Sequence, residues 1–256
     1  MPRTILLLGG TSETAPLAEA LAEQGFAVLV STATAVPLNI GNHPRIRKRT
    51  GPLDEAQLID LIETEDIRAI LDATHPYAEL IGPQARAVCR QMNLPYFRWL
   101  RPATLAEETG ITFADNHTAA AALAFSFGVP VLLTIGSKNL EPYVQESRKT
   151  GIPIIARILD HPDSRAICQE LGLSPEAVIT GKGPFSVQEN KSQIKKFGIG
   201  VLVTKDSGKA GGVPEKINAA ESESCRVVVV RRPEQTGEYF DQMETLVKTL
   251  LDVLTR

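Results

Sequence analysis

Short apolar runs alternate with longer segments of helical periodicity along the whole chain. The apolar runs predict strands at residues 4–8, 26–31, 67–71, 96–99, 111–114, 131–135, 152–158, 177–180, 199–204 and 226–231, and we expect a short, basic strand at 45–49. The segments between them predict helices at 14–24, 53–63, 77–92, 117–125, 164–171 and 239–254. Asn139 can cap a further helix, and Ser186 and Glu189 have the spacing of a capping box, which predicts another helix start there. Strands separated by helices of about 10–15 residues favour parallel sheets with right-handed crossovers.

The predicted elements divide into two α/β halves. The second half begins after Pro102, and we expect the two halves to face each other across a cleft. We assign residues 1–115 to an N-terminal domain and 116–256 to a C-terminal domain. Parallel strands present their functional groups at the carboxyl edge of the sheet, so the loops that follow strands are the places to look for chemistry.

Composition narrows the class of protein. The chain has 256 residues, is 43% hydrophobic and carries a net charge of −3, which argues against a nucleic-acid partner. It has no apolar run long enough for a membrane span and no signal-peptide pattern, so we expect a cytoplasmic protein. We expect a monomer, which suffices for a cleft between two domains. The three cysteines and four histidines lack the spacing of a metal site, and we expect buried cysteines and no protein-bound metal.

The loop after the first strand could bind a phosphate. Gly9-Gly10-Thr11-Ser12 stands between that strand and the first helix. Glycines allow a pyrophosphate to approach the backbone, the helix start offers amide groups, and the two hydroxyls add donors. Thr14 departs from the full dinucleotide fingerprint, and a purely structural turn is an equal alternative.

The end of the second strand bears on the choice of cofactor. NAD enzymes usually place an acidic residue there for the ribose, whereas this strand ends in Ser31 and Thr32. A 2′-phosphate would therefore meet hydroxyl donors rather than a carboxylate. The nearest cations are Arg45, Arg47, Lys48 and Arg49, which could equally form a solvated edge strand.

The segment Asp72-Ala73-Thr74-His75-Pro76-Tyr77 follows the fourth strand and holds three groups that can carry protons. We expect His75 to be the only histidine at such an edge, and its charge can change near neutral pH. In the ordinary alternative, Asp72 caps local amides and His75 fills a turn.

Three loops of the second half carry residues suited to an acidic ligand. The candidates are Lys138 after one strand, Lys182 and Ser186 after another, and Lys205, Asp206 and Ser207 after a third, with Lys209 close behind. We expect them to collect at one sheet edge and to bind several carboxylates, although any single lysine could be a surface charge. Gly211-Gly212 with Lys216 resembles a flexible loop over the same edge.

These segments resemble the precorrin-6A reductase family of cobalamin biosynthesis, which includes the cobalt-precorrin-6A reductases. The matching stretches occur in order at residues 7–13, 72–78, 96–102, 133–138, 183–186, 204–208 and 230–233. The resemblance implies two Rossmann-like domains and an NADPH-dependent oxidoreductase that reduces a ring double bond of the tetrapyrrole precorrin-6A, or its cobalt form, to precorrin-6B.

The resemblance also implies site residues. It places cofactor contacts at Gly9, Gly10, Thr11, Ser12, Ser31, Gly51 and the turn from Asp72 to Tyr77, to which we add Thr32. As a hypothesis, His75 or Tyr77 lies near the nicotinamide, and Lys205 orients the macrocycle. Two alternatives remain: a non-catalytic NADP-binding regulator, and a nucleotide-sugar or S-adenosylmethionine transferase on a similar fold.

Overall fold

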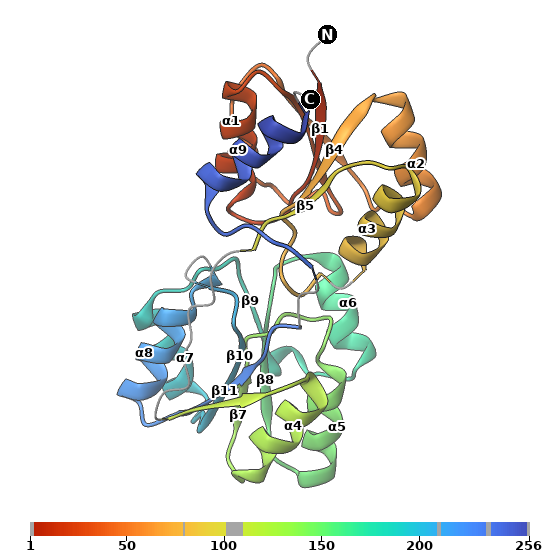
Figure 1. The fold of residues 1–256 in the computed structure, drawn as a ribbon. Coiled ribbons are helices and arrows are strands. Elements are labelled where there is room, and N and C mark those ends of the chain that lie inside the picture. The colour runs from red at the N-terminus through yellow and green to blue at the C-terminus, as the bar shows by residue number, and fades with distance from the viewer. Residues whose placement is uncertain (1–2, 79, 101–109, 209–210, 234–236, 255–256) are drawn as a thin grey trace. The chain divides into compact units, whose positions relative to one another are not determined.

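The computed structural model describes residues 3–78, 80–100, 110–208, 211–233 and 237–254. The chain divides into two compact units (Figure 1). The first unit comprises Met1–Pro102 and Glu234–Arg256, and the second comprises Ala103–Pro233. Lys209 lies outside the described residues.

The first unit is a doubly wound α/β layer structure. Its elements are β1 (Thr4–Leu8), α1 (Thr14–Glu23), β2 (Ala27–Thr32), β3 (Ile46–Thr50), α2 (Glu55–Thr64), β4 (Ile67–Asp72), α3 (Ile81–Gln91), β5 (Tyr96–Arg98) and α9 (Met243–Leu254). All strand pairs are parallel, in the order β3-β2-β1-β4-β5. This is the strand order of dinucleotide-binding folds, and it places a topological switch point between β1 and β4.

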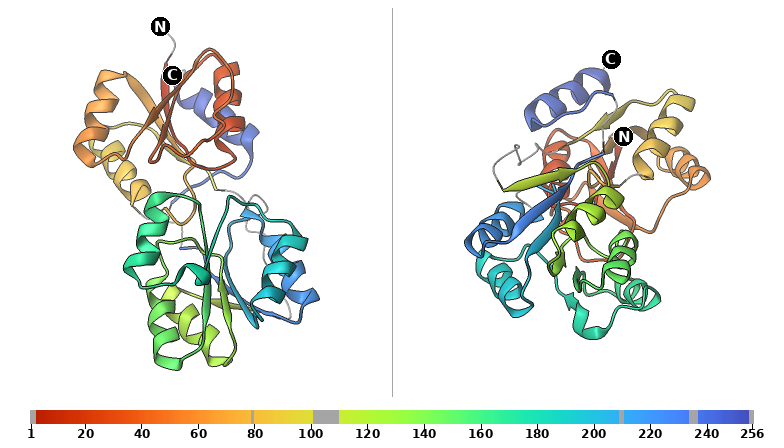
Figure 2. Two further views of the ribbon diagram at one scale, coloured as in Figure 1. Left: turned by 180° about the vertical axis from the view of Figure 1, so that it is seen from behind. Right: turned by 90° about the horizontal axis from the view of Figure 1, so that it is seen from below.

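Alternate residues of the first sheet face two apolar layers. Ile5 and Leu7 pack with α1 and α9, whereas Leu6 and Leu8 pack with α2 and α3. Figure 2 shows these helix pairs on opposite faces of the sheet. Because both faces are covered, the central strand β1 is buried throughout and reads as an apolar run, whereas the edge strand β3 is basic and partly exposed.

The second unit repeats that plan. Its elements are β6 (Ile111–Ala114), α4 (His117–Ser126), β7 (Val131–Leu133), α5 (Glu141–Thr150), β8 (Ile154–Ile158), α6 (Pro162–Glu170), a 3₁₀ turn (Pro175–Ala177), β9 (Val178–Thr180), α7 (Val187–Lys196), β10 (Val201–Lys205), α8 (Val213–Ser222) and β11 (Arg226–Val230). The parallel sheet has the order β6-β11-β10-β7-β8-β9. Read from β9 to β11, it matches the first sheet, with β7 in the place of β1 and β10 in the place of β4.

The two units differ from the expected domains 1–115 and 116–256 in two respects. Strand β6 pairs with β11 and so belongs to the second unit. Helix α9 belongs to the first unit, because Leu246, Leu250 and Leu254 are buried in the same apolar layer as Ile5. The division into units depends on contacts between segments far apart in sequence, and the local sequence pattern does not show these contacts.

Four predictions about helices are wrong. Helix α9 begins at Met243, not residue 239. Helix α3 begins at Ile81, not residue 77, because a start at 77 would put Pro83 in the helix interior, where its missing N–H is costly. Leu140, not Asn139, occupies the N-cap of α5. The expected loop around Lys216 is helix α8, in which Gly212 is the N-cap and Pro214 lies in the first turn.

Among the residues that the structure describes, no helix has the length and apolar character needed to cross a membrane.

Candidate functional site

The β1–α1 loop combines tight packing with open space. A Cβ at Gly9 would lie 2.8 Å from Cγ2 of Thr14, so the chain requires glycine there. Gly10 has φ +129°, and a Cβ there would meet nothing within 4 Å. The Thr14 hydroxyl accepts hydrogen bonds from the amides of Gly10 at 3.2 Å and Thr11 at 3.3 Å. The loop is therefore held by Thr14, and its outer side at Gly10 leaves room for a ligand.

The hydroxyl of Thr11 has a structural partner. Thr11 is buried, and its Oγ1 donates to the carbonyl of Ala73 at 3.2 Å, which joins the β1 loop to the end of β4. The exposed Ser12 hydroxyl donates to Oε1 of Glu13 at 3.1 Å. Of the two hydroxyls, that of Ser12 is the one at the surface.

A cation of the neighbouring strand β3 lies at the carboxyl end of β2. Nη1 of Arg49 donates to Ser31 Oγ at 2.7 Å and to the Gly51 carbonyl at 3.0 Å. The Gly51 amide donates to the carbonyl of Thr32 at 2.9 Å, and Gly51 has φ +124°. The structure thus brings Ser31, Thr32 and Gly51 together. Arg49 was one of four candidate cations in the sequence, and only the β2–β3 pairing distinguishes it from the others.

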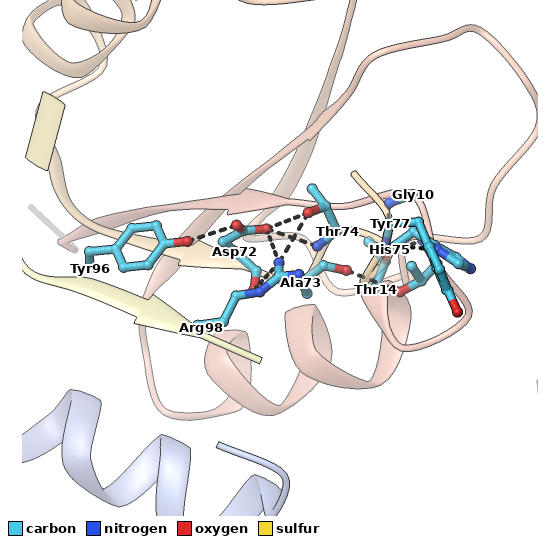
Figure 3. A network of polar contacts seen from close by, with 10 residues as sticks. Gly10, Thr14, Asp72, Ala73, Thr74, His75, Tyr77, Tyr96 and Arg98 are labelled. Carbon is cyan, nitrogen blue, oxygen red and sulfur yellow. Dashed lines mark hydrogen bonds and ion pairs between the residues drawn. The ribbon is translucent and has the colours of Figure 1, made fainter. Parts of the chain in front are cut away.

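Asp72 is the centre of a buried polar network at the end of β4 (Figure 3). Its Oδ1 accepts from Thr74 N at 3.0 Å and Thr74 Oγ1 at 2.7 Å, and it pairs with Arg98 Nη1 at 2.5 Å. Its Oδ2 accepts from Tyr96 Oη at 2.8 Å. Asp72 is 0% exposed and Arg98 5% exposed. The buried carboxylate therefore stabilises the turn by accepting from Thr74, which agrees with the alternative in which Asp72 caps local amides.

Tyr96 responds to this environment. Burial, followed by the charge of Asp72 and their hydrogen bond, raises the pKa of Tyr96 above its ordinary value. The phenol therefore stays protonated and acts as a donor to Asp72. Arg98 and Tyr96 come from β5, so the network ties the turn after β4 to the neighbouring strand.

The turn carries His75 and Tyr77 on its outer side. His75 Nδ1 accepts from the amide of Tyr77 at 3.3 Å, and the two ring centroids are 5.5 Å apart. Figure 3 places both rings at the Gly10 end of the network, with Tyr96 at the far end. The Gly9 amide also donates to the Ser31 carbonyl at 2.9 Å. The first unit therefore brings together the three loops that were expected to hold the cofactor.

These features fit a dinucleotide phosphate. Gly10 leaves space at the start of α1, whose first turn contains no acidic residue. The end of β2 presents the guanidinium of Arg49 and the hydroxyl of Ser31, and both groups can bind a phosphate. A carboxylate at that point would favour NAD, and the end of β2 has none.

The second unit has a corresponding switch point between β7 and β10. Both the amide and the hydroxyl of Thr134 donate to the carbonyl of Val203, at 2.9 and 2.8 Å. Lys138 is exposed in the loop after β7, and Lys205 ends β10. The sequence prediction that these two loops meet at one sheet edge is confirmed within this unit.

Asp206 and Ser207 are buried rather than displayed. The carboxylate of Asp206 pairs with Arg232 Nη2 at 3.3 Å, and its carbonyl accepts from Arg232 Nε at 2.8 Å. A Cβ at Gly211 would lie 1.9 Å from Ser207 Oγ, so the loop closes tightly against Gly211. Both residues thus shape the loop that carries Lys205.

Lys182 and Ser186 lie after β9, at the sheet edge, with β8 and β7 between them and β10. Ser186 is the N-cap of α7 and forms a capping box with Glu189, as its spacing predicted. Its hydroxyl and amide both donate to Glu189 Oε2 at 2.7 Å. Lys182 is exposed. One strand, β8, separates this pair from the loop of Lys138, and two strands separate it from Lys205.

Lys216 is a buried cation that sequence reasoning placed in a loop. It is 7% exposed, and its Nζ donates to Thr204 Oγ1 at 3.3 Å and to the Gly211 carbonyl at 2.9 Å. Burial, with the charge of Arg157 adding to it, lowers the pKa of Lys216 to about 7. Lys216, on α8, therefore links Thr204 of β10 to Gly211 in the loop that follows β10.

Arg157, in the middle of β8, is a second buried cation. Its Nη1 donates to the side-chain oxygens of Asn190 and Gln193 at 2.7 and 2.8 Å, and its guanidinium lies 4.2 Å from the centroid of Phe185. Burial lowers its pKa to about 10. These contacts fix the loop that precedes α7.

Two further histidines lie at a carboxyl sheet edge, so the expectation that His75 is the only one is wrong. His161 follows β8 and is the N-cap of α6. His117 follows β6 and is the first residue of α4. Its Nδ1 is 3.0 Å from the hydroxyl of the fully buried Tyr143 on α5. Burial, and then the charge of Lys205, lowers the pKa of His117 to about 4. A short predicted strand before it was the available sequence signal.

Within the described part of the chain, no group of three acidic, histidine or cysteine side chains could hold a metal ion. Cys89, Cys168 and Cys225 are buried, as expected, and are free thiols.

The chain is similar to proteins of one family over nearly its full length. The family model described as precorrin-6x reductase CbiJ/CobK matches residues 4–251. A cobalt-precorrin-6A reductase of Priestia megaterium is 30% identical over 97% of this chain and 98% of its own. A precorrin-6A reductase of Rhodobacter capsulatus is 30% identical over 90% of this chain and 88% of its own. The solved structure of a CobK precorrin-6A reductase has a TM-score of 0.76 and 26% identity, covering 98% of this chain and 96% of that one. The chain therefore belongs to the precorrin-6x reductase CbiJ/CobK family of oxidoreductases.

Proposed function

We propose that this protein reduces a ring double bond of precorrin-6A, or of cobalt-precorrin-6A, to give precorrin-6B in cobalamin biosynthesis, with NADPH as the hydride donor. Family membership supports the reaction class. The observation that carries the choice of cofactor is the contact between Arg49 and Ser31 at the end of β2.

The first unit would hold the cofactor. The pyrophosphate would lie at Gly10 and Ser12, where the loop is open, and the 2′-phosphate at Arg49, Ser31 and Thr32. Thr11 and Ala73 would keep the loops after β1 and β4 in register, since the hydroxyl of Thr11 donates to the carbonyl of Ala73. Gly9 would join the β1 loop to β2, since its amide donates to the carbonyl of Ser31. Thr74 and Asp72 would set the turn, and the bound nicotinamide would supply the hydride.

His75 and Tyr77 would act beside the nicotinamide. The Tyr77 amide donates to Nδ1 of His75, so a neutral His75 carries its proton on Nε2. In that state the ring can orient a ligand by donation, and once protonated it can give up a proton. General acid assistance of this kind contributes about 10²–10⁴-fold.

The second unit would bind the carboxylates of the tetrapyrrole. Lys138 and Lys205 stand at its switch point, and Lys205 would orient the macrocycle. Asp206 and Ser207 would shape the Lys205 loop, and Lys182 with Ser186 would reach a more distant carboxylate.

The reaction is tested by mixing purified protein with NADPH and precorrin-6A without oxygen. We expect NADPH absorbance to fall and the tetrapyrrole to gain two hydrogens by mass spectrometry. Binding of NADPH without its oxidation would instead favour a regulator, and no binding of NADPH would favour a transferase.

The cofactor assignment is tested by the variant Arg49→Gln. We expect the Kd for NADPH to rise about tenfold while that for NADH changes little, because only NADPH carries the 2′-phosphate. Arg47→Gln is the matched control: it removes the same charge from the same strand, but Arg47 pairs with Glu65 instead. Equal effects of both variants would reject Arg49 as the phosphate ligand.

A further inference from the structure

His117 and Tyr143 join two helices at the carboxyl edge of the second sheet. His117 opens α4 after β6, and Tyr143 lies in the first turn of α5 after β7. Lys205, at the end of β10, is close enough for its charge to act on the imidazole. The pair therefore stands beside the switch point formed by β7 and β10.

The buried hydroxyl fixes the tautomer of the imidazole. Tyr143 is 0% exposed, and burial raises the pKa of its phenol, so the oxygen keeps its proton. A buried O–H needs an acceptor, and Nδ1 of His117 lies 3.0 Å away. If Nδ1 accepts, the proton of a neutral imidazole is on Nε2. That nitrogen lies on the edge of the ring away from Tyr143.

His117 stays neutral over the physiological range, since its pKa is lowered to about 4 by burial and by Lys205. The ring therefore presents one N–H donor and no charge. A neutral donor costs less to keep beside a lysine than a second cation would, and it still binds an acceptor.

The groups around this edge favour an anionic acceptor. Lys205 contributes a positive charge, and the carboxylate of Asp206 is already bound by Arg232. Asp115, before α4, pairs with Arg231 at 3.3 Å. These two carboxylates are thus paired with arginines.

We propose that His117 is a substrate-binding residue whose Nε2–H donates to a carboxylate of the tetrapyrrole, and that Tyr143 is the positioning residue that holds its ring. This inference rests on the proposed function and adds to it a donor on the second unit. His117, the first residue of α4, would thus help to select among carboxylate-bearing macrocycles.

Two substitutions of His117 separate binding from structure. In His117→Gln the amide nitrogen falls near the position of Nε2, so the donor is kept and the Tyr143 contact is lost. In His117→Asn the side chain can still accept from Tyr143, but it cannot reach as a donor. We expect the Kd for precorrin-6A to rise about tenfold or more in the Asn variant and by less than about threefold in the Gln variant. A merely structural role predicts the reverse order.

Tyr143→Phe supplies the second arm, with the Kd for NADPH as a control in all variants. Long-range ¹H–¹⁵N NMR of the intact protein should show His117 as the Nε2–H tautomer in the wild type and a mixture in Tyr143→Phe. We expect that variant to weaken precorrin-6A binding by about threefold and to leave NADPH binding unchanged.

The outcomes distinguish the two levels of the proposal. An Asn variant that binds precorrin-6A as the wild type does, or an Nδ1–H tautomer in the wild type, would overturn the role of His117 while the reductase activity stands. A wild-type protein that fails to bind precorrin-6A would overturn both.

Discussion

The buried pair of Asp72 and Arg98 gives the sharpest test of how the turn after β4 is held. Arg98→Met removes a guanidinium that is 5% exposed and leaves the carboxylate of Asp72 with Thr74 and Tyr96 as its donors. Breaking one side of a buried ion pair costs about 3–5 kcal/mol. Asp72→Asn is expected to cost a similar amount, because it leaves the guanidinium buried without its counter-charge.

The double variant Asp72→Asn with Arg98→Met separates the pair from its surroundings. Removing both charges avoids the uncompensated ion, so the double variant should cost less than the sum of the single ones, by about 1–3 kcal/mol. Tyr96→Phe removes one hydrogen bond to a charged group and should cost about 1.5–3 kcal/mol.

Trp99, the only tryptophan of the chain, supplies the assay. It is buried in the apolar layer of the first unit, next to Arg98, so its fluorescence in urea reports on unfolding of that unit. The same variants should weaken NADPH binding, since the turn at Ala73 and Thr74 is no longer held by the hydrogen bonds and the ion pair of Asp72. Single variants that each cost under about 1 kcal/mol, or costs that simply add, would refute this account of the network.

Three further expectations follow from other contacts. The pKa of Lys216 is lowered to about 7 in the folded state, so between about pH 7 and pH 10 the unfolded chain binds more protons than the folded protein. The free energy of unfolding of the wild type should therefore increase with pH relative to that of Lys216→Met, by on the order of 1–3 kcal/mol. Parallel pH profiles of the two proteins in urea titrations would contradict this. Gly10→Ala should weaken NADPH binding, whereas Gly128→Ala, at another positive φ with open space around it, should strain the backbone without changing the Kd for NADPH; equal binding by both variants would remove Gly10 from the phosphate site. Burial raises the pKa of the Cys89 and Cys225 thiols to about 12 and also raises that of Cys168, so a thiol reagent near pH 8 should label them only as urea unfolds the protein, and rapid labelling of the native protein would count against their burial.

The strands were predictable because both faces of each sheet are covered. Every predicted strand is present within one or two residues. The central strands are apolar because they are buried on both sides, whereas the edge strand β3 is basic and partly exposed. The loops after β1, β2 and β4 also met as expected, because parallel strands end at one edge. The capping box of Ser186 and Glu189 was likewise legible, as it depends on a spacing of three residues.

Contacts between segments far apart in the chain could not be predicted from the sequence. Helix α9 carries an ordinary amphipathic pattern, and nothing in it says which sheet it covers. The roles of Asp72 and His117 depend on partners at Arg98 and Tyr143, 26 residues away in each case. Proline positions were readable in principle: Pro83 rules out a helix start at Tyr77, and Pro214 fits the first turn of α8.

The two sheets share a strand order, so the difference in their chemistry must come from their loops. Each switch point is closed by a threonine hydroxyl that donates to a carbonyl across it, Thr11 to Ala73 in one unit and Thr134 to Val203 in the other. Around the first stand an open glycine and Arg49, which suit a phosphate; around the second stand Lys205 and the neutral donor His117, which suit carboxylates. If this division is correct, substitutions at the first switch point should change the Kd for NADPH and those at the second the Kd for precorrin-6A, each by tenfold or so with little effect on the other. Loss of both affinities from a change at either edge, in a protein that remains folded, would mean that the two ligands are not divided between the units in this way.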